Sequence, residues 1–389
     1  RAANGVILVT TKTGKAGKAQ FSARAKIGAT QLANDNNFGV MTAQELLDFQ
    51  RTAAINAGYN PDDPTSPYYR PYSLVSGPLN NWMKAVTKIG KLSEYEVNAQ
   101  GGNDKGRFYS SLSYQNNEGI AYAVSYKRLT ARVNADYKLL KTLEMGARVN
   151  LAYTENHDTE MQALYYSSPL FGGLTIQPWT PIYDENGEYN LSIPENSNTN
   201  PLYNALCHGE DQWEKQYKVQ ASEYLQWTPI KNLVFKTNNM IDATFGEGRR
   251  YWGPDPGDTE GTLQGSNSQY VQLTTSNTAQ YSFEAGKNSV RLLAGQEAMK
   301  RTYRSLYGYA PGVDANIPYF STSIASSSEI SDSYNARTLL SFFGNVDYNF
   351  DQRYFASASI REDGSSLFGS NSRWGTFWSV AGSWNISNE

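Results

Sequence analysis

The sequence predicts an all-β protein, a transmembrane antiparallel up-and-down β-barrel. Three observations support this prediction. About twelve segments alternate apolar and polar residues with a period of two, as strands with one apolar and one polar face do. The connections between these segments are alternately short and long, and aromatic residues gather near the segment ends. Outer-membrane barrels combine short turns on one side, long loops on the other and aromatic girdles at both interfaces.

The composition fits this class and excludes others. Charged residues make up only 18% of the 389 residues, and the net charge of −3 predicts no nucleic-acid partner. Cys207 is the only cysteine, and His157 and His208 are the only histidines. We therefore expect no internal disulfide, no metal site and no cofactor, and we expect both histidines to be solvated in loops. No window holds the roughly 18 apolar residues of a membrane helix, which a strand-built membrane protein does not need.

The first hundred residues are expected to mix strands and helices. The continuous apolar run Val6–Val9 predicts a short strand buried on both faces of a compact element. Alternation starts at Ala19. In the long connection that follows, Thr42 and Glu45 have the spacing of a capping box and predict a helix. A second short helix is expected over 81–89.

Later segments show the period of two more cleanly. Over 125–138, Ala131, Val133 and Ala135 share one face, and Arg132, Asn134 and Asp136 share the other. Segments from 143 to 153 and over 342–350, 354–361 and 377–386 repeat this pattern.

The connections place the loops on one side. Tight turns are predicted near Gly102–Lys105, Leu140–Lys141, Pro229–Lys231, Gly286–Asn288 and Asp351–Gln352. Long connections are expected after the first strand and at about 157–215, 247–265 and 304–335, with shorter ones at 117–124 and 365–372. Loops of such length are usually functional. Strands of 11 residues or more exceed the roughly 9–11 that cross a bilayer, so several should project beyond it.

Nothing in the sequence predicts an enzyme. The adjacent carboxylates at Asp62–Asp63, Glu210–Asp211 and Glu362–Asp363 point to opposite faces of an extended chain, so no pair can flank a glycosidic bond. Asp184–Gly187 resembles part of a calcium loop but lacks the downstream ligands. A hairpin turn before Tyr189 explains it better.

Motifs at the two ends resemble one family. Residues 1–12 (Arg-Ala-Ala-Asn-Gly-Val-Ile-Leu-Val-Thr-Thr-Lys) resemble the end of the plug domain in SusC/RagA-type TonB-linked outer-membrane transporters. Residues 361–369 (Arg-Glu-Asp-Gly-Ser-Ser-Leu-Phe-Gly) and 373–377 (Arg-Trp-Gly-Thr-Phe) are similar to a mid-barrel motif of that family. Asn117–Ile120 with Tyr126–Arg128 fits its early barrel strands. The family usually has Pro where Trp378 stands.

The resemblance implies a Gram-negative outer-membrane transporter of 22 strands, of which this chain would hold about twelve. Residues 1–18 would be the C-terminal end of the plug domain and residues 19–389 the N-terminal half of the barrel. The chain would then be a piece of a longer protein. The implied partners are a SusD-like lipoprotein lid, outer-membrane lipid, and the TonB–ExbB–ExbD complex, which would act through an upstream segment.

Two sets of side chains are candidates for contact with plug or solute. The polar faces of the strands predict a lumen-facing set: Arg132, Asn134, Asp136, Arg148, Asn345, Asp347 and Arg361. Aromatic side chains in or near the long loops are candidate sugar platforms: Tyr165, Tyr166, Phe171, Trp179, Trp213, Tyr251 and Trp252. These aromatics could equally pack the loops together or against a lid.

The expected function is TonB-dependent import of a nutrient, with oligosaccharide as the expected substrate. A peptide importer of the same family is the alternative. A soluble β-rich carbohydrate-binding or adhesion protein is the alternative from a different class, because alternation alone also suits a soluble sandwich.

Overall fold

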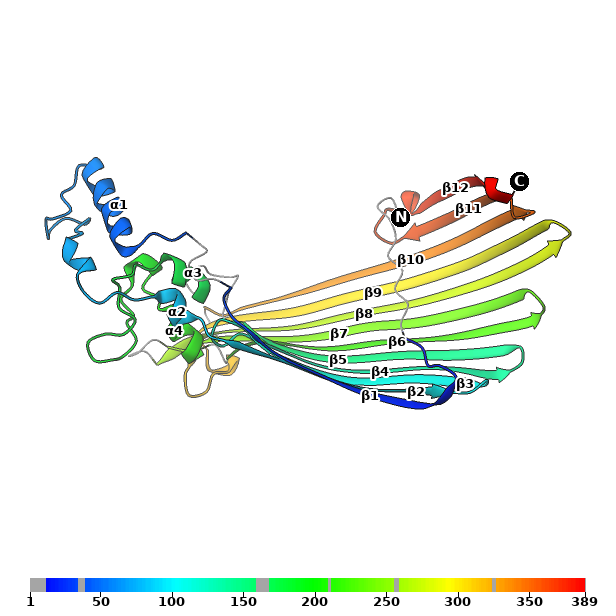
Figure 1. Ribbon diagram of the computed structural model, residues 1–389, viewed down its shortest axis with the longest axis horizontal. Helices are drawn as coiled ribbons and strands as arrows, with labels where there is room; N and C mark the ends of the chain where they lie inside the picture. The colour runs from blue at the N-terminus through cyan, green and yellow to red at the C-terminus, as the bar shows by residue number, and fades with distance from the viewer. Residues whose placement is uncertain are drawn as a thin grey trace.

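The chain forms a single twelve-stranded sheet in the residues that the computed structural model describes, which are 12–33, 39–158, 168–208, 211–254, 259–323 and 327–388. Every strand pairs antiparallel with its neighbours in chain order, and the sheet curves into a trough with β1 and β12 at its edges (Figure 1). The strands are β1 (Gly17–Thr30), β2 (Gly90–Gly102), β3 (Gly106–Glu118), β4 (Ser125–Leu140), β5 (Leu143–His157), β6 (Gln212–Ile230), β7 (Leu233–Trp252), β8 (Glu260–Ala285), β9 (Asn288–Asp314), β10 (Glu329–Phe350), β11 (Tyr354–Ser365) and β12 (Trp374–Trp384). The predicted all-β, up-and-down architecture is confirmed.

The helices are short, and α1 to α4 lie together at one end of the sheet (Figure 1). They are α1 (Ala43–Asn56), η1 (Tyr72–Val75), α2 (Trp82–Val86), α3 (Pro169–Thr175), η2 (Pro194–Asn196), α4 (Pro201–Tyr203), η3 (Asn204–His208), η5 (Phe320–Thr322), η7 (Ser370–Ser372) and η8 (Ile386–Asn388). Among the described residues, no helix has the length and apolar character needed to cross a membrane.

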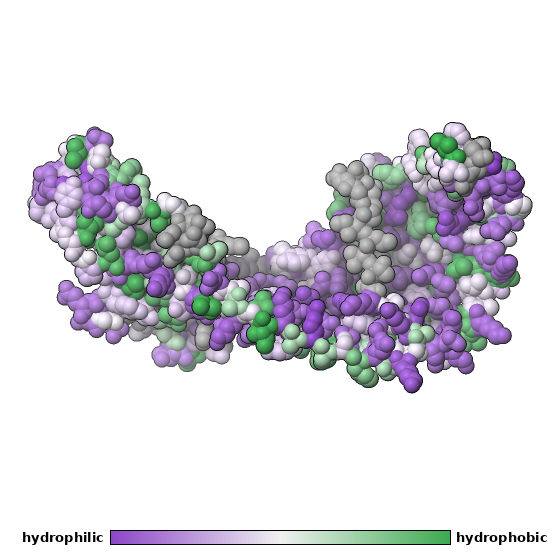
Figure 2. All heavy atoms as spheres, viewed as in Figure 1, coloured by the Kyte–Doolittle hydropathy of each residue, from purple (hydrophilic) through white to green (hydrophobic). Residues whose placement is uncertain are grey.

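The two faces of the sheet differ in the way that the alternation predicts. On β4, Val133 is 52% exposed on the convex face, whereas its neighbour Asn134 is 3% exposed on the concave face. A water-soluble sheet would bury the valine and expose the amide. The inverted pattern is that of a wall with an apolar outside and a polar inside. In Figure 2 the molecule is hollowed between the loop end and the turn end.

Two rows of aromatic side chains border the apolar outside. On the loop side, paired residues run across six strands and are aromatic on all of them except β4: Tyr95, Tyr114, Leu129, Tyr153, Tyr217 and Phe245. On the turn side, Trp227 of β6 pairs with Phe235 of β7, and their rings stack with centroids 5.7 Å apart. Ten residues separate the two rows along β6 and along β7. At about 3.3 Å per residue and a tilt of about 40°, the band is ~25 Å tall, the height of a barrel's lipid-facing band.

The tight turns lie where the sequence predicts them, within about two residues. The hairpin between β10 and β11 has Asp351 and Gln352 both at φ 54°, the left-handed conformation of a type I′ turn. This turn matches the right-handed twist of the strands that it joins.

Two of the expected long connections are wrong in extent. β7 continues to Trp252 and β8 begins at Glu260, so the connection predicted over 247–265 shrinks to a few residues. β9 continues to Asp314 and β10 begins at Glu329, which shortens the one predicted over 304–335. Five Gly in 247–265 and eight Ser in 304–335 weaken the alternation, but the strand pairing extends into both stretches. The strands therefore project well beyond the aromatic row.

The long connections on one side fold into a loop cluster with its own small core. Helix α1 begins with the predicted capping box: the Glu45 amide donates to Thr42 Oγ1 at 3.2 Å, and the Thr42 amide donates to Glu45 Oε2 at 2.8 Å. The second predicted helix is shorter than expected and ends at Val86. Helices α3 and α4 were not predicted. The core residues are Trp82, Val86, Ile176, Ile193 and Leu202.

Other local predictions have separate outcomes. Tyr183 and Tyr189 form an antiparallel bridge around Asp184–Gly187, which confirms the hairpin turn there. The predicted strand Val6–Val9 and the candidate aromatics Tyr165 and Tyr166 lie outside the described residues. The expectation of a solvated loop is wrong for His157, which ends β5 with its side chain 20% accessible and contacts Glu155 at 3.0 Å.

Candidate solute-facing wall

The strand register places the whole predicted lumen-facing set on the concave face. Asn134 pairs with Arg148, and the ladder carries this face across β6 to β9 to Leu339 of β10. Asn345 and Asp347 lie an even number of residues from Leu339, so they share its face. Arg361 pairs with Phe343 on that same face. Whether these residues line a closed lumen stays a prediction.

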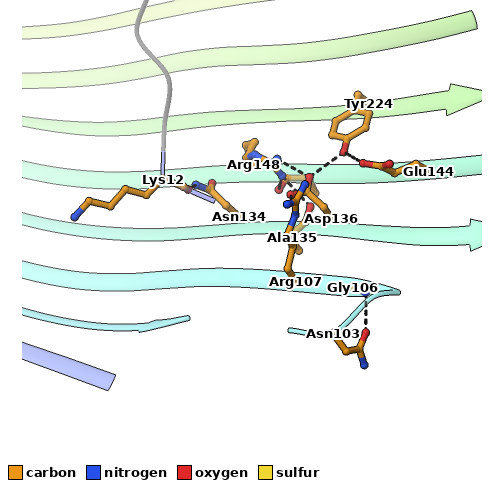
Figure 3. A network of polar contacts seen from close by, with 11 residues as sticks. Lys12, Asn103, Gly106, Arg107, Asn134, Ala135, Asp136, Glu144, Arg148 and Tyr224 are labelled. Atoms are coloured by element: carbon orange, nitrogen blue, oxygen red, sulfur yellow. Dashed lines mark hydrogen bonds and ion pairs between the residues drawn. The ribbon is translucent and has the colours of Figure 1, made fainter. Parts of the chain in front are cut away.

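A buried polar network lies on this face near the turn end of β3 to β6, with Asp136 at its centre (Figure 3). Asp136 is 7% exposed. Its carboxylate accepts from Arg148 Nη2 at 2.5 Å and from the Tyr224 hydroxyl at 2.9 Å, and it lies 3.4 Å from Arg107 Nε. Three strands besides β4 therefore supply partners for one carboxylate. Both carboxylate oxygens therefore have donors, which offsets part of the free-energy cost of burying this charge.

The network continues to the next carboxylate. The Tyr224 hydroxyl also lies 2.7 Å from Glu144 Oε1. A phenol has one proton, so it donates to only one of the two carboxylates at a time. The ammonium of Lys236 lies 4.6 Å from the centroid of the Tyr224 ring, where the ring's negative face attracts it. Two carboxylates and three cations, Arg107, Arg148 and Lys236, thus lie close together on the wall.

Gly146 makes room for the network. A Cβ at this position would lie 2.6 Å from Asp136 Oδ1 and would overlap the Tyr224 ring. Because Gly146 pairs with both Asp136 and Tyr224, the missing side chain lets their polar groups meet across β5. A glycine in mid-strand often marks such a close approach.

A segment before β1 rests on this wall. The side-chain amide of Asn134 donates through Nδ2 to the backbone carbonyl of Lys12 at 2.7 Å, and Lys12 Nζ lies 5.9 Å from the centroid of the Tyr109 ring. Asn134 and Tyr109 are both buried. The concave face therefore offers polar groups that can hold a polypeptide segment in the hollow.

A second set of ion pairs lies on the concave face of β9 to β11. Arg361 donates to Asp363 Oδ1 at 2.7 Å and to Glu297 Oε1 at 3.2 Å. Arg291 Nε lies 3.2 Å from Asp347 Oδ2. These charges are compensated within the wall, so the wall can present hydrogen-bonding groups to water and polar solutes without a large net field.

The structure does not bring the candidate aromatic residues together. Phe171 is exposed on α3, and Trp179 is half-buried beside Thr180, whose carbonyl accepts from the Trp82 indole. Trp213 lies on the convex face of β6, with Lys215 Nζ 4.0 Å from its ring centroid.

The last two candidates lie at the end of β7. Tyr251 is buried against Leu263, Ala310 and Val313. Trp252, the next residue, is half-buried on the opposite, concave side. Contact of any of these aromatics with sugar remains a proposal.

Sequence reasoning missed several members of the Asp136 network. Arg107, Glu144 and Tyr224 were not singled out, although each lies at a polar-face position of its strand. The period-two pattern could have placed them on the concave face. It could not show that they meet, because that depends on the register between strands.

The comparisons with known proteins agree on one group. No protein-family model matches the chain. The TonB-dependent receptor P26 of Formosa agariphila is 26% identical over 404 residues, which cover all of this chain and 39% of the relative. The TonB-dependent receptor SusC of Bacteroides thetaiotaomicron is 24% identical over 421 residues, again covering all of this chain and 39% of the relative. The chain thus spans about two fifths of the length of these relatives.

Solved structures give the same result for the fold. The RagAB peptide importer in its open-open state matches with a TM-score of 0.83 at 26% identity, covering all of this chain and 46% of that one. Another structure of the RagAB peptide transporter matches with a TM-score of 0.83 at 24% identity, covering 47% of that chain. The twelve strands therefore have the arrangement of part of the barrel in these transporters.

Proposed function

The chain is related to the SusC/RagA-type TonB-dependent receptors and corresponds to part of one, and on this premise we propose that the protein containing it imports a nutrient across an outer membrane. The proposal depends on the difference between the convex and the concave face of the sheet. The convex face has an apolar band ~25 Å tall between two aromatic rows, and the concave face carries buried ion pairs and amides. Such a wall separates lipid from a polar passage.

The proposal includes the parts that such a passage needs. Residues 1–18 are proposed to end a plug domain, since the segment from Lys12 already rests on Asn134 and Tyr109 of the wall. Residues 19–389 are proposed to form about half of the barrel. A wide barrel conducts only when its plug moves. We propose that TonB, with ExbB and ExbD, supplies the energy, and that a SusD-like lipoprotein covers the loop side.

Oligosaccharide is the proposed substrate class. Its hydroxyls suit amides, carboxylates and compensated ion pairs, and the wall offers these. The proposed role is binding and passage, not chemistry on the solute.

Peptide is the second candidate, because the similar solved structures are of a peptide importer. The experiment that separates the two uses the full-length protein purified with its lid lipoprotein. A pool of neutral oligosaccharides should raise the unfolding temperature of the complex, and a pool of short peptides should not. Protection by peptides alone would contradict the sugar assignment.

The membrane location has its own test. Membranes from cells that produce the full-length protein are washed with high salt and with alkaline carbonate. The protein should stay in the membrane fraction until detergent is added, because the apolar band is stable in lipid or detergent and not in water. Release by salt would favour the soluble carbohydrate-binding or adhesion protein instead.

A further inference from the structure

A polar cavity of about 300 Å³ lies on the concave face where β5 to β9 approach the loops. Two rows of paired residues form it. Gln212, Arg250 and Gln264 make one row across β6 to β8. Glu214 belongs to the other row, two residues nearer the apolar band on β6. We call this the loop-side cavity.

A missing side chain creates the floor of the cavity. Gly248 pairs with Glu214 on one side and with Ser266 on the other. A Cβ at Gly248 would lie 2.6 Å from Ser266 Oγ. The hydroxyl therefore occupies the space that a side chain would need, and it faces the cavity with the neighbouring amides.

Gln212 is the feature that indicates a ligand. Gln212 lines the cavity, its side chain is 4% exposed, and its Oε1 is buried without a hydrogen-bond partner. A buried acceptor without a donor is destabilising, and buried polar groups are almost always satisfied. A donor on a molecule in the cavity would satisfy it.

The charges around the cavity are already engaged within the protein. Glu214 Oε1 accepts from Gln216 Nε2 at 2.8 Å. Asp158 and Arg250 also have contacts within the protein. A charged ligand would have to compete with these contacts, whereas a neutral ligand with hydroxyl groups would add to them.

The size and the remaining lining narrow the class of ligand. A volume of about 300 Å³ has room for a single sugar ring. Tyr307 lines the cavity with its side chain partly exposed, and an aromatic face beside amides and carboxylates is the usual surface for a pyranose.

We propose that the loop-side cavity binds one neutral hexose unit of the oligosaccharide, with Gln212 Oε1 accepting from a ring hydroxyl. This inference rests on the proposed function. It assigns the first contact of the solute with the wall to β6, β7 and β8, before the solute reaches the Asp136 network.

The test uses the full-length protein in detergent and ligand-observed NMR. The probes are glucose, galactose and mannose, with glucuronic acid and dialanine as comparisons. At least one neutral hexose should bind in the millimolar range. Gln212→Ala should weaken this binding about three- to tenfold, as expected for one hydrogen bond. Gly248→Val, which fills the floor, should abolish it.

Gln226→Ala is the matched control, because Gln226 lies on the same strand and the same face but near the turns. It should bind hexose like the wild type. Equal binding of hexose by wild type, Gln212→Ala and Gly248→Val would overturn the assignment of the loop-side cavity as the binding site. Gln212-dependent binding of dialanine in place of hexoses would overturn the sugar assignment.

Uptake of oligosaccharide by cells separates this inference from the proposed function. Wild-type uptake that neither cavity variant changes would reject the cavity and leave the importer standing. Hexose binding that needs Gln212, without any uptake by the wild type, would support the cavity and reject sugar import.

Discussion

At the scale of single residues, the Asp136 network shows how charge is kept inside a thin wall. Asp136 is accessible to water over only a few per cent of its surface, yet it meets an arginine from each neighbouring strand and a tyrosine from β6. Each donor comes from a different strand, so the network also fixes the register between strands. A slip of β4 by one residue would turn Asp136 to the convex face, away from its three partners.

Removing the centre of this network should destabilise the barrel strongly. Asp136→Ala leaves Arg148 and Arg107 without their carboxylate, and breaking a buried pair in this way costs about 3 kcal/mol. Tyr224→Phe keeps the ring and loses one hydrogen bond, at about 1 kcal/mol. Urea unfolding of the full-length protein in liposomes measures both. The double variant Asp136→Ala, Arg148→Ala should recover part of the loss, and equal stability of all variants would contradict the network.

Arg51 makes a second residue-scale prediction, this time in the loop cluster. Its guanidinium donates to both oxygens of Asp62, at 2.7 and 2.8 Å, and lies over the Tyr72 ring at 4.1 Å. The hydrogen bond from Arg51 holds the pKa of the Asp62 carboxyl below its usual range. The folded state lowers this pKa, so the pair stabilises α1 at pH values above the pKa of Asp in the unfolded chain, about 3.9. That stabilisation is lost as the pH falls from there through the lowered pKa.

We therefore expect α1 to loosen between about pH 4 and the lowered pKa of Asp62. Pepsin digestion of the full-length protein across this range should cut near α1 faster as pH falls. In Asp62→Asn the pair is absent at every pH, so cutting should already be fast at pH 4. Asp48→Asn, a carboxylate on the same helix that bonds Gln44, should behave like the wild type. A wild-type rate independent of pH would refute the assignment.

At the scale of elements, the sequence predicted strands better than loops, for a physical reason. Alternation is a local signal, so β4 could be placed almost residue by residue from Val133 and Asn134. Helix α1 was found because its cap is also local, in Thr42 and Glu45. Helices α3 and α4 are stabilised by burial against Trp82, which lies about a hundred residues away in the chain, and no local pattern records that contact.

In the candidate site, too, the sequence predicted what local alternation determines and missed what depends on the rest of the fold. The sequence placed Asn134, Asp136 and Arg148 on one face, and the register supports that placement. It could not place Gln212 in a cavity, because the cavity depends on β6 and β7 being longer than the alternation indicated. The loop aromatics were chosen by residue type alone, and the structure spreads them over both faces of the sheet and the loop cluster.

Glu223 of β6 is one departure from the pattern of an apolar convex face and a polar concave face. Glu223 is exposed on the convex face of β6, four residues from Trp227 and six from Tyr217, so it lies near mid-height of the apolar band. Its partner across the strands is Asn239, whose amide donates to it at 3.4 Å. A carboxylate in contact with lipid at this depth destabilises a barrel.

Glu223→Leu should therefore stabilise the full-length protein in liposomes by about 1–2 kcal/mol, measured by urea unfolding. Glu247→Leu is the control, because Glu247 lies on the same face of β7 beyond the aromatic row at Phe245. It should change stability little. Lower stability of Glu223→Leu together with a smaller assembly would mean that protein, not lipid, covers this part of the wall.

At the scale of the whole molecule, the strand order β1 to β12 leaves two edges in the described part of the chain, at β1 and at β12. Each edge strand has backbone N–H and C=O groups on one side without a ladder partner. In hydrocarbon such groups cost several kcal/mol each, and only closed barrels avoid this. In water they pair with other chains and aggregate. The sheet therefore needs further strands, or pairing of β1 with β12, before it is stable in a membrane.

The diameter of the barrel depends on whether further strands complete the sheet or β1 pairs with β12. One comparison distinguishes the two. Residues 1–389 and the full-length protein are refolded separately into detergent and analysed by size exclusion and by heat-dependent migration in gels. The full-length protein should be monodisperse and should migrate differently when boiled, as closed barrels do. Residues 1–389 should aggregate. If they instead give a monodisperse, heat-modifiable species, then β1 pairs with β12, the barrel closes with twelve strands, and its lumen is too narrow for a folded plug, since barrel diameter grows with strand number.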